Sequence, residues 1–416
     1  MKSEINRLLH EKNLDAIVIS GSGSHNAPLK YFTKDAFFTH AQIVIIRDQD
    51  PVLFYRPMER DNAERTGFKK ICYDSFPQKD FYTISKGNSN LANALELQSM
   101  FRSLGFIKGR AAFCGQLEFG THLAMLQEFQ RLMPEIEIAG SEGIEILNQA
   151  RFTKDESELA AIRKMGEIVV KIAGRVEQYI QSNYLKNGIL VDQNELPVTI
   201  GMIKKSINMW LTELGAENPN GTIFSMGRDA GVPHNEGNDD AVIEAGKSIV
   251  FDFFPCETGG GYFYDFTRTW CIGYASQEIE KAYEQVRFVH DAVLKDICPG
   301  KSLKELQHLT CRLFREMGHQ TIEDHPGTQE GYVHSVSHGL GLNVHERPFS
   351  GISASDADVI LPGTVFTVEP GLYYPEIENP FGVRIEDTIY IDNDGNAQYF
   401  VQYPYHLVIP VKQLEK

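Results

Sequence analysis

Residues 248–269 read SIVFDFFPCETGGGYFYDFTRT, and this stretch decides the fold of the carboxyl-terminal part of the chain. Two apolar, strand-like segments flank a turn of three glycines, and each contains one aspartate, Asp252 and Asp265. A buried carboxylate without a partner is costly, or its pKa shifts until the group is neutral. The stretch therefore predicts two strands whose carboxylates meet something cationic.

Two further carboxylates occupy similar surroundings. Glu369 ends TVFTVE just before Pro370 and a glycine, and Glu386 lies within the alternating segment GVRIEDTIYI. A salt bridge, with Arg268 or Arg384 as partner, or exposure at a strand end would explain any one of these carboxylates alone. Four of them in one region, each on a strand flanked by glycine or proline, favour a shared metal.

Histidines are concentrated in the same region. Five of the thirteen fall within 27 residues (His319, His325, His334, His338, His345), and three of them lie in HSVSHGLGLNVHERP, residues 334–348. His319 and His325 have no comparable context and are expected to be structural.

Four carboxylates with one imidazole form a ligand set that suits Mn(II), Co(II), Fe(II) or Zn(II). Two divalent ions would balance the four negative charges and activate a water at neutral pH.

Periodicity divides the chain into two domains, residues 1–150 and 151–416. The first alternates helical pieces (2–14, 58–67, 122–133) with strands (15–20, 41–48, 51–57, 110–115), which indicates an α/β domain. In the second, a capping box of Thr153 and Glu156 opens a long helix that runs to Ile180. Further helices are expected from Ser276 and from Ser302, and the rest reads as strands and turns, typical of an α+β domain.

Composition and missing motifs exclude several classes of protein. The formal net charge of −16 argues against nucleic acid and anionic membranes as partners. We expect no signal peptide, and the longest apolar runs are too short to cross a bilayer. Six scattered cysteines form no CxxC and suggest free thiols in the cytoplasm. The sequence contains no GxxxxGK[ST], HExxH or G-x-S-x-G motif, and GSGS at residues 21–24 lacks the third glycine of a dinucleotide loop.

Four ordered motifs resemble those of the pita-bread metallopeptidases, which include methionine aminopeptidase, Xaa-Pro aminopeptidase and prolidase. They are DFFPCETGGGYFYDFTRT, HSVSHGLGLNVHERP, TVFTVEPGLY and GVRIEDT, and the resemblance covers residues 150 to 416. The first 150 residues resemble the amino-terminal domain of creatinase, prolidase and Xaa-Pro aminopeptidase, which methionine aminopeptidases lack. The resemblance implies an α+β pita-bread catalytic domain, with two pseudo-symmetric halves around a curved antiparallel sheet, preceded by a smaller α/β domain.

The resemblance also implies roles for individual residues. The metal ligands would be Asp252, Asp265, His338, Glu369 and Glu386, with Asp265 and Glu386 shared by both ions. His234 in GVPHNEG would line the substrate pocket, and His334 and His345 would contact the scissile carbonyl or the adjoining amide. Glu369 is the expected general base, and Arg384, two residues before Glu386 and so on the same strand face, would orient a bridging carboxylate. The 13-residue spacing of Asp252 and Asp265 exceeds the commonest family spacing, which leaves open an altered loop near Asp252.

The function implied is dinuclear metal-dependent hydrolysis of the amino-terminal peptide bond, with Xaa-Pro peptides as substrates and manganese as the expected metal. Both dipeptidase and aminopeptidase remain compatible with the sequence. Two alternatives lack the ligand set, a creatinase-like amidinohydrolase and a non-catalytic binding protein on the same scaffold. A cytoplasmic homodimer is expected from the likeness.

Overall fold

The computed structural model describes residues 4–414, which fold as two compact units. The first comprises residues 4–151 and the short segment 259–261, and the second comprises residues 152–258 and 262–414. The helix expected at residues 2–14 is present as α1 (Ile5–Glu11), and residues 2 and 3 of that expectation lie outside the described residues. Nowhere between residues 4 and 414 does a helix combine the length and hydropathy needed to cross a bilayer.

The first unit contains a six-stranded mixed sheet in the order β4-β3-β2-β1-β5-β6. Its strands are β1 (Ala16–Gly21), β2 (Ala41–Ile46), β3 (Val52–Tyr55), β4 (Lys69–Cys72), β5 (Gly109–Gln116) and β6 (Ile136–Ile138). Its other helices are α2 (Ala27–Thr33), α3 (Arg60–Arg65), α4 (Gln78–Ile84), α5 (Ser89–Ser103), α6 (Phe119–Leu132) and α7 (Glu142–Arg151). β1 pairs antiparallel with β2 and parallel with β5, so the unit is α/β, as expected.

A nine-stranded sheet forms the centre of the second unit, in the order β10-β11-β13-β19-β16-β14-β15 with β20 beside β19 and β21 beside β13. Its strands are β10 (Thr222–Met226), β11 (Ser248–Phe253), β13 (Phe266–Ile272), β14 (His338–Gly339), β15 (Glu346–Phe349), β16 (Val365–Val368), β19 (Glu386–Ile391), β20 (Ala397–Tyr399) and β21 (Val408–Ile409). Smaller pairings involve β7 (Tyr184–Lys186), β8 (Ile189–Val191), β22 (Lys412–Gln413), β9 (Ala216–Glu217), β12 (Cys256–Glu257), β17 (Gly371–Tyr374) and β18 (Phe381–Arg384).

One expected strand is broken in two. GVRIEDTIYI contains β18, which pairs with β17, and β19, which belongs to the large sheet, and the chain changes sheet at Ile385. The expectation that Arg384 and Glu386 lie on one strand was therefore wrong. The alternation of apolar and polar residues does not reveal such a break, because both halves are equally buried.

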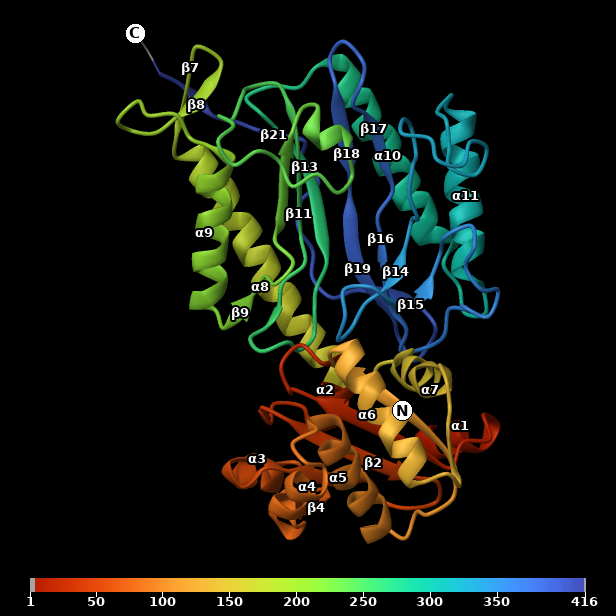
Figure 1. Ribbon diagram of the computed structural model, residues 1–416. Coiled ribbons are helices and arrows are strands. Elements are labelled where there is room, and N and C mark those ends of the chain that lie inside the picture. The colour runs from red at the N-terminus through yellow and green to blue at the C-terminus, as the bar shows by residue number, and fades with distance from the viewer. Residues whose placement is uncertain (1–3, 415–416) are drawn as a thin grey trace. The chain divides into compact units, whose positions relative to one another are not determined.

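Four long helices pack against the large sheet: α8 (Glu156–Gln181), α9 (Ile200–Glu213), α10 (Gln277–Asp296) and α11 (Leu303–Glu316). In Figure 1, α8 and α9 lie to one side of the strands and α10 and α11 to the other. The apolar faces of α8 and α9 share one core with residues of β11 and β13, and those of α10 and α11 share a second core with residues of β16 and β19. Each helix pair thus covers its own part of the curled sheet.

The starting residues of three helices were predicted, and two of them were correct. Ser276 caps α10, and Ser302 with Glu305 forms the capping box of α11. The capping box of α8 is formed by Asp155 and Glu158, so the prediction of Thr153 and Glu156 was wrong by two residues. Thr153 instead bridges to Thr364 in extended conformation, and an aspartate two residues on satisfies the free backbone N–H groups equally well.

Gly382 in β18 allows a close backbone approach that no other residue permits. A Cβ at this position would lie 1.8 Å from the carbonyl oxygen of Ala230, in the short helix η4 (Asp229–Gly231). Gly382→Ala should therefore lower the free energy of unfolding by about 3 kcal/mol, measured by chemical denaturation. Gly174→Ala is the control, because nothing lies within 4 Å of its Cβ in the interior of α8, and it should change stability by at most about 1 kcal/mol. Equal effects would contradict the close approach.

Candidate metal centre

Strand register places three side chains in one row across the large sheet. Asp252 in β11 pairs with Thr267 in β13, and Thr267 pairs with Glu386 in β19. Directly paired residues point to the same face of a sheet, and so do residues two apart along a strand. Asp265 precedes Thr267 by two residues and joins the same face. The carboxylates of Asp252, Asp265 and Glu386 therefore share this face, and they are buried, with exposed fractions of 7 %, 3 % and 2 %.

His338 and Glu369 complete the cluster from β14 and from the end of β16. His338 Nε2 lies 3.4 Å from Glu369 Oε1 and 3.6 Å from Asp265 Oδ2. Donor atoms of Asp265, His338 and Glu386 all lie within 4.8 Å of one another. His338 Nδ1 is 3.1 Å from the carbonyl oxygen of Gly339, a contact that places the ring proton on Nδ1 and leaves the Nε2 lone pair directed at the carboxylates.

The carboxylates lack the positive charge that their burial requires. Burial raises the pKa of Asp265 and of Glu386 well above the usual range, and negative neighbours raise both further. Burial also raises the pKa of Glu369 to about 8. Oδ1 of Asp252 and Oε1 of Glu386 are buried without a hydrogen bond to any described residue. Clustered oxygen donors with unsatisfied atoms beside one neutral imidazole fit divalent metal ions.

Arg384 supplies one positive charge at the edge of the cluster. Its Nη2 donates to Asp252 Oδ2 at 2.5 Å and its Nη1 donates to the Tyr373 hydroxyl at 2.7 Å. Although Arg384 and Glu386 lie on different strands, the guanidinium still reaches the carboxylate cluster. Arg268, the other candidate partner, pairs instead with Asp387 at 2.9 Å beneath the sheet.

The other two histidines of the motif lie beside the ligands. His334 Nδ1 is 3.9 Å from Glu369 Oε2, and its Nε2 is 2.8 Å from the hydroxyl of Tyr373. The His345 ring stands edge-on to the His338 ring, with 4.3 Å between centroids. Burial lowers the pKa of His334 and of His338 to about 3, so both imidazoles are neutral at pH 7. A histidine must be neutral to bind a metal ion.

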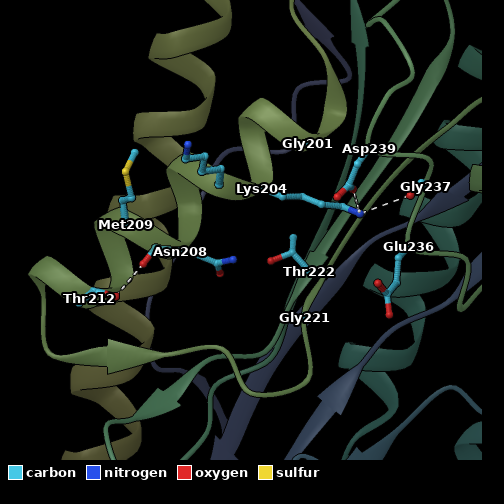
Figure 2. A pocket seen from close by; sticks show the side chains of 11 residues that line it. Gly201, Lys204, Asn208, Met209, Thr212, Gly221, Thr222, Glu236, Gly237 and Asp239 are labelled. Carbon is cyan, nitrogen blue, oxygen red and sulfur yellow. Dashed lines mark hydrogen bonds and ion pairs between the residues drawn. The ribbon is translucent and has the colours of Figure 1, made fainter.

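His234 lies on an exposed loop that hydrogen bonds hold in place. Figure 2 shows Lys204 reaching from α9 across a cavity of about 720 Å³ to the far end of this loop. Lys204 Nζ is 2.8 Å from Asp239 Oδ1 and 3.4 Å from the carbonyl oxygen of Gly237. His234 itself is exposed, and its role in lining the substrate pocket stays a prediction.

Sequence reasoning missed two residues that organise this centre. The Thr267 hydroxyl donates to Glu386 Oε2 at 2.7 Å, and the Tyr373 hydroxyl joins Arg384 to His334. Thr267 could have been found from its position two residues after Asp265, on the same strand face. Tyr373 gave no comparable signal, because its contacts depend on how β17 and β18 pair.

A profile of metallopeptidase family M24 matches residues 160–393, more than half of the chain. The chain belongs to metallopeptidase family M24. The resemblance inferred from the four motifs is thereby confirmed.

Two curated relatives are similar to this M24 chain over more residues than the family profile covers. The Xaa-Pro dipeptidase of Pyrococcus horikoshii is 26 % identical over 398 residues, 95 % of each chain. The probable dipeptidase PepE of Mycobacterium tuberculosis is 27 % identical over 265 residues, which is 64 % of this chain and 62 % of the relative. The match thus spans less than two thirds of PepE.

Among solved structures, the X-Pro aminopeptidase of Thermotoga maritima MSB8 superposes with a TM-score of 0.72 at 23 % identity, covering 99 % of both chains. The prolidase of Pyrococcus furiosus gives the same TM-score at 20 % identity, with 96 % of this M24 chain and 99 % of the prolidase covered. The expected fold, a pita-bread domain after a smaller α/β domain, is confirmed.

Proposed function

We propose that this M24 chain hydrolyses the amino-terminal peptide bond of short peptides and prefers proline at the second position. The convergence of Asp252, Asp265, His338, Glu369 and Glu386 on one sheet face carries the proposal. The Xaa-Pro dipeptidase and X-Pro aminopeptidase named above support the choice of substrate. Creatinase-like and non-catalytic alternatives are disfavoured because both would lack this donor set.

The five residues would hold two divalent ions, with Asp265 and Glu386 shared. Manganese is the proposed metal, and cobalt, zinc and iron suit the same donors. When bound, such a pair supplies a nucleophilic water at neutral pH and polarises the scissile carbonyl. The six cysteines, all within residues 4–414, form no disulfide, which supports a reducing cytoplasmic location, and a homodimer is proposed from the family likeness.

The proposed roles of the remaining side chains follow from their positions. The Glu369 side chain is 15 % exposed and directed at His338, so it can accept the proton of the attacking water and pass it to the leaving nitrogen. His345, exposed beside His338, can donate a hydrogen bond to the developing oxyanion. His334 contacts Tyr373 through Nε2, so its contact with the substrate amide requires it to exchange that partner. Arg384 holds Asp252 in place.

Substrate panels test the proposal directly. Metal-loaded protein should cleave Ala-Pro or Ala-Pro-Ala at least about tenfold faster than Met-Ala-Ser, as measured by release of the amino-terminal residue. The ratio of the first two rates separates dipeptidase from aminopeptidase. Absence of cleavage in protein that contains about two equivalents of metal would refute the peptidase proposal.

Glu369→Gln removes the proposed proton carrier. Turnover of an Xaa-Pro substrate should fall by about 10²–10⁴-fold, because the amide cannot accept the proton. Steady-state rates, together with the metal content of the purified variant, measure the effect. Glu378→Gln is a control on an exposed loop and should keep its activity. A near-normal rate for Glu369→Gln would assign proton transfer to another group.

The raised pKa of Glu369 predicts how stability depends on pH and metal. Without metal, the folded protein keeps this proton up to about pH 8, whereas the unfolded chain releases it near its usual pKa. The stability that the protonated group contributes is therefore lost as pH rises from about 4.5 to 8. A metal ion replaces the proton, so manganese should raise the melting temperature more at pH 8 than at pH 5.5. Equal increments in a thermal-shift titration would contradict this linkage.

A further inference from the structure

A second cavity lies wholly within the first unit, at the point where its strand order reverses. From β1 the chain continues to β2 on one side, and from β5 it continues to β6 on the other, although β1 and β5 are parallel neighbours. In open α/β sheets, ligands bind outside the carboxyl ends of strands at such a switch point. A cavity of about 380 Å³ lies there, between Ser20 near the end of β1, Leu117 just after β5, and helices α5 and α6.

Buried polar side chains line the floor of this cavity. Ser20 is 2 % exposed and Gln42 is 8 % exposed. Gln42 Nε2 donates to Ser20 Oγ at 3.0 Å, and the Tyr73 hydroxyl donates to Gln42 Oε1 at 2.8 Å. Burying such groups is unfavourable unless their hydrogen bonds are made. The floor is thus a polar surface held in place by its own hydrogen bonds. Apolar side chains at these positions would avoid the free-energy cost of burying polar groups.

One opposite-charge pair faces the cavity. Arg56 Nη1 lies 3.6 Å from Glu96 Oε1, and the guanidinium carbon stands 4.4 Å from the centroid of the Tyr73 ring. Gln78 donates to the same oxygen of Glu96. Glu96 is buried, yet its Oε2 has no hydrogen bond to any residue between 4 and 414. The pair therefore offers both a donor and an acceptor to a ligand.

Two imidazoles in the cavity wall contact aromatic rings but have no hydrogen-bond partner. The ring nitrogens of His40 and His122 make no hydrogen bond or ion pair with the part of the chain that the structure describes. Burial lowers the pKa of both, and Arg56 lowers that of His40 further. A neutral imidazole presents one donor and one acceptor. Together with Asn93 at the lip, they add neutral hydrogen-bonding groups around the charged pair.

The charges and the size of the cavity define the ligand. Arg56, Glu96 and Glu118 have a formal net charge of −1, which disfavours phosphates, and the volume suits a small molecule. In an α-amino acid the amino nitrogen lies about 2.5 Å from the carboxyl carbon, so its two charged groups are close enough to contact Arg56 and Glu96 at the same time. We propose that this cavity binds a free α-amino acid, with its carboxylate on Arg56 and its ammonium on Glu96. The inference does not depend on the peptidase proposal.

Calorimetric titration of the full-length protein with L-proline, L-leucine and L-alanine tests the inference. Glu386→Gln serves as the background, because its reduced metal content weakens binding at the metal centre. At least one of the amino acids should bind to this background, and Arg56→Gln and Glu96→Gln added to it should each weaken binding at least about tenfold. Arg60→Gln, on the exposed face of α3, is the matched control and should leave binding unchanged. The N-acetyl and amide derivatives, each lacking one charge, should bind at least about tenfold more weakly.

Because Glu96 is buried, its variant could fail to fold, and Asn93→Trp provides an independent test. Asn93 is exposed on α5, so an indole there fills the cavity mouth without disturbing the floor. This variant, confirmed as folded by its melting curve, should lose binding. The inference is overturned if no amino acid binds the Glu386→Gln background at about 10 mM, or if binding survives both Arg56→Gln and Asn93→Trp.

Discussion

Replacing Glu386 by glutamine should lower kcat/KM on an Xaa-Pro substrate by at least about 10³-fold and reduce the bound metal to about one equivalent or less. One carboxylate oxygen of Glu386 accepts a hydrogen bond from Thr267, and the other has no hydrogen bond. Glutamine removes the negative charge and replaces one of the two oxygens that two metal ions would share. Metal analysis of the purified variant and steady-state kinetics measure the two effects.

Thr267→Val provides a graded comparison for that experiment. It keeps the carboxylate of Glu386 but removes the hydroxyl that orients it, so metal affinity should fall by about 10–100-fold and the ligand set should remain. Full activity and two equivalents of metal in Glu386→Gln would show that this carboxylate is not a ligand.

Arg384→Met should destabilise the metal-free protein by about 3–5 kcal/mol. The guanidinium is 3 % exposed and contacts both Asp252 and Tyr373, so methionine leaves a buried carboxylate without its cation. Bound metal would supply positive charge to the same carboxylates, so the loss should be smaller in the metal-loaded protein. Urea denaturation with and without manganese measures both values.

A surface arginine serves as the control for this variant. Arg228 pairs with Glu376 at 2.7 Å, but both side chains are more than half exposed, so Arg228→Met should change stability by less than about 1 kcal/mol. If Arg384→Met destabilises the metal-free and the metal-loaded protein equally, then Arg384 stabilises the fold through packing and not by compensating the negative charge of the carboxylates.

The buried position of the carboxylates could be predicted from the sequence, because a charged residue within an apolar strand is easy to recognise. Asp252 and Asp265 stood out as charged residues in aromatic strands, and the structure brings them together on one sheet face. Their assignment as metal ligands stays a prediction. Thr267, which completes the row, was overlooked because a threonine in a strand is unremarkable until its cross-strand partners are known.

Features that depend on long-range pairing could not be predicted. The break at Ile385 and the contacts of Tyr373 follow from which strands meet, and a short-range pattern contains no such information. α5, which has 15 residues, and α9, which has 14, were both missed. In α5 the polar and apolar residues are weakly segregated, whereas α9 lies in a region that was expected to contain only strands and turns. The cap of α8 was misplaced because several nearby residues can cap equally well.

The connection between Asp252 and Asp265 leaves the large sheet after Phe253 and returns to it at Phe266. Strand register, and not the length of this connection, places both aspartates on one sheet face, so a spacing of 13 is no obstacle to a complete cluster. Inside β13, one inserted residue would turn every following side chain to the opposite face. The two strands of this hairpin must therefore conserve parity, whereas the loop between them carries no such parity requirement.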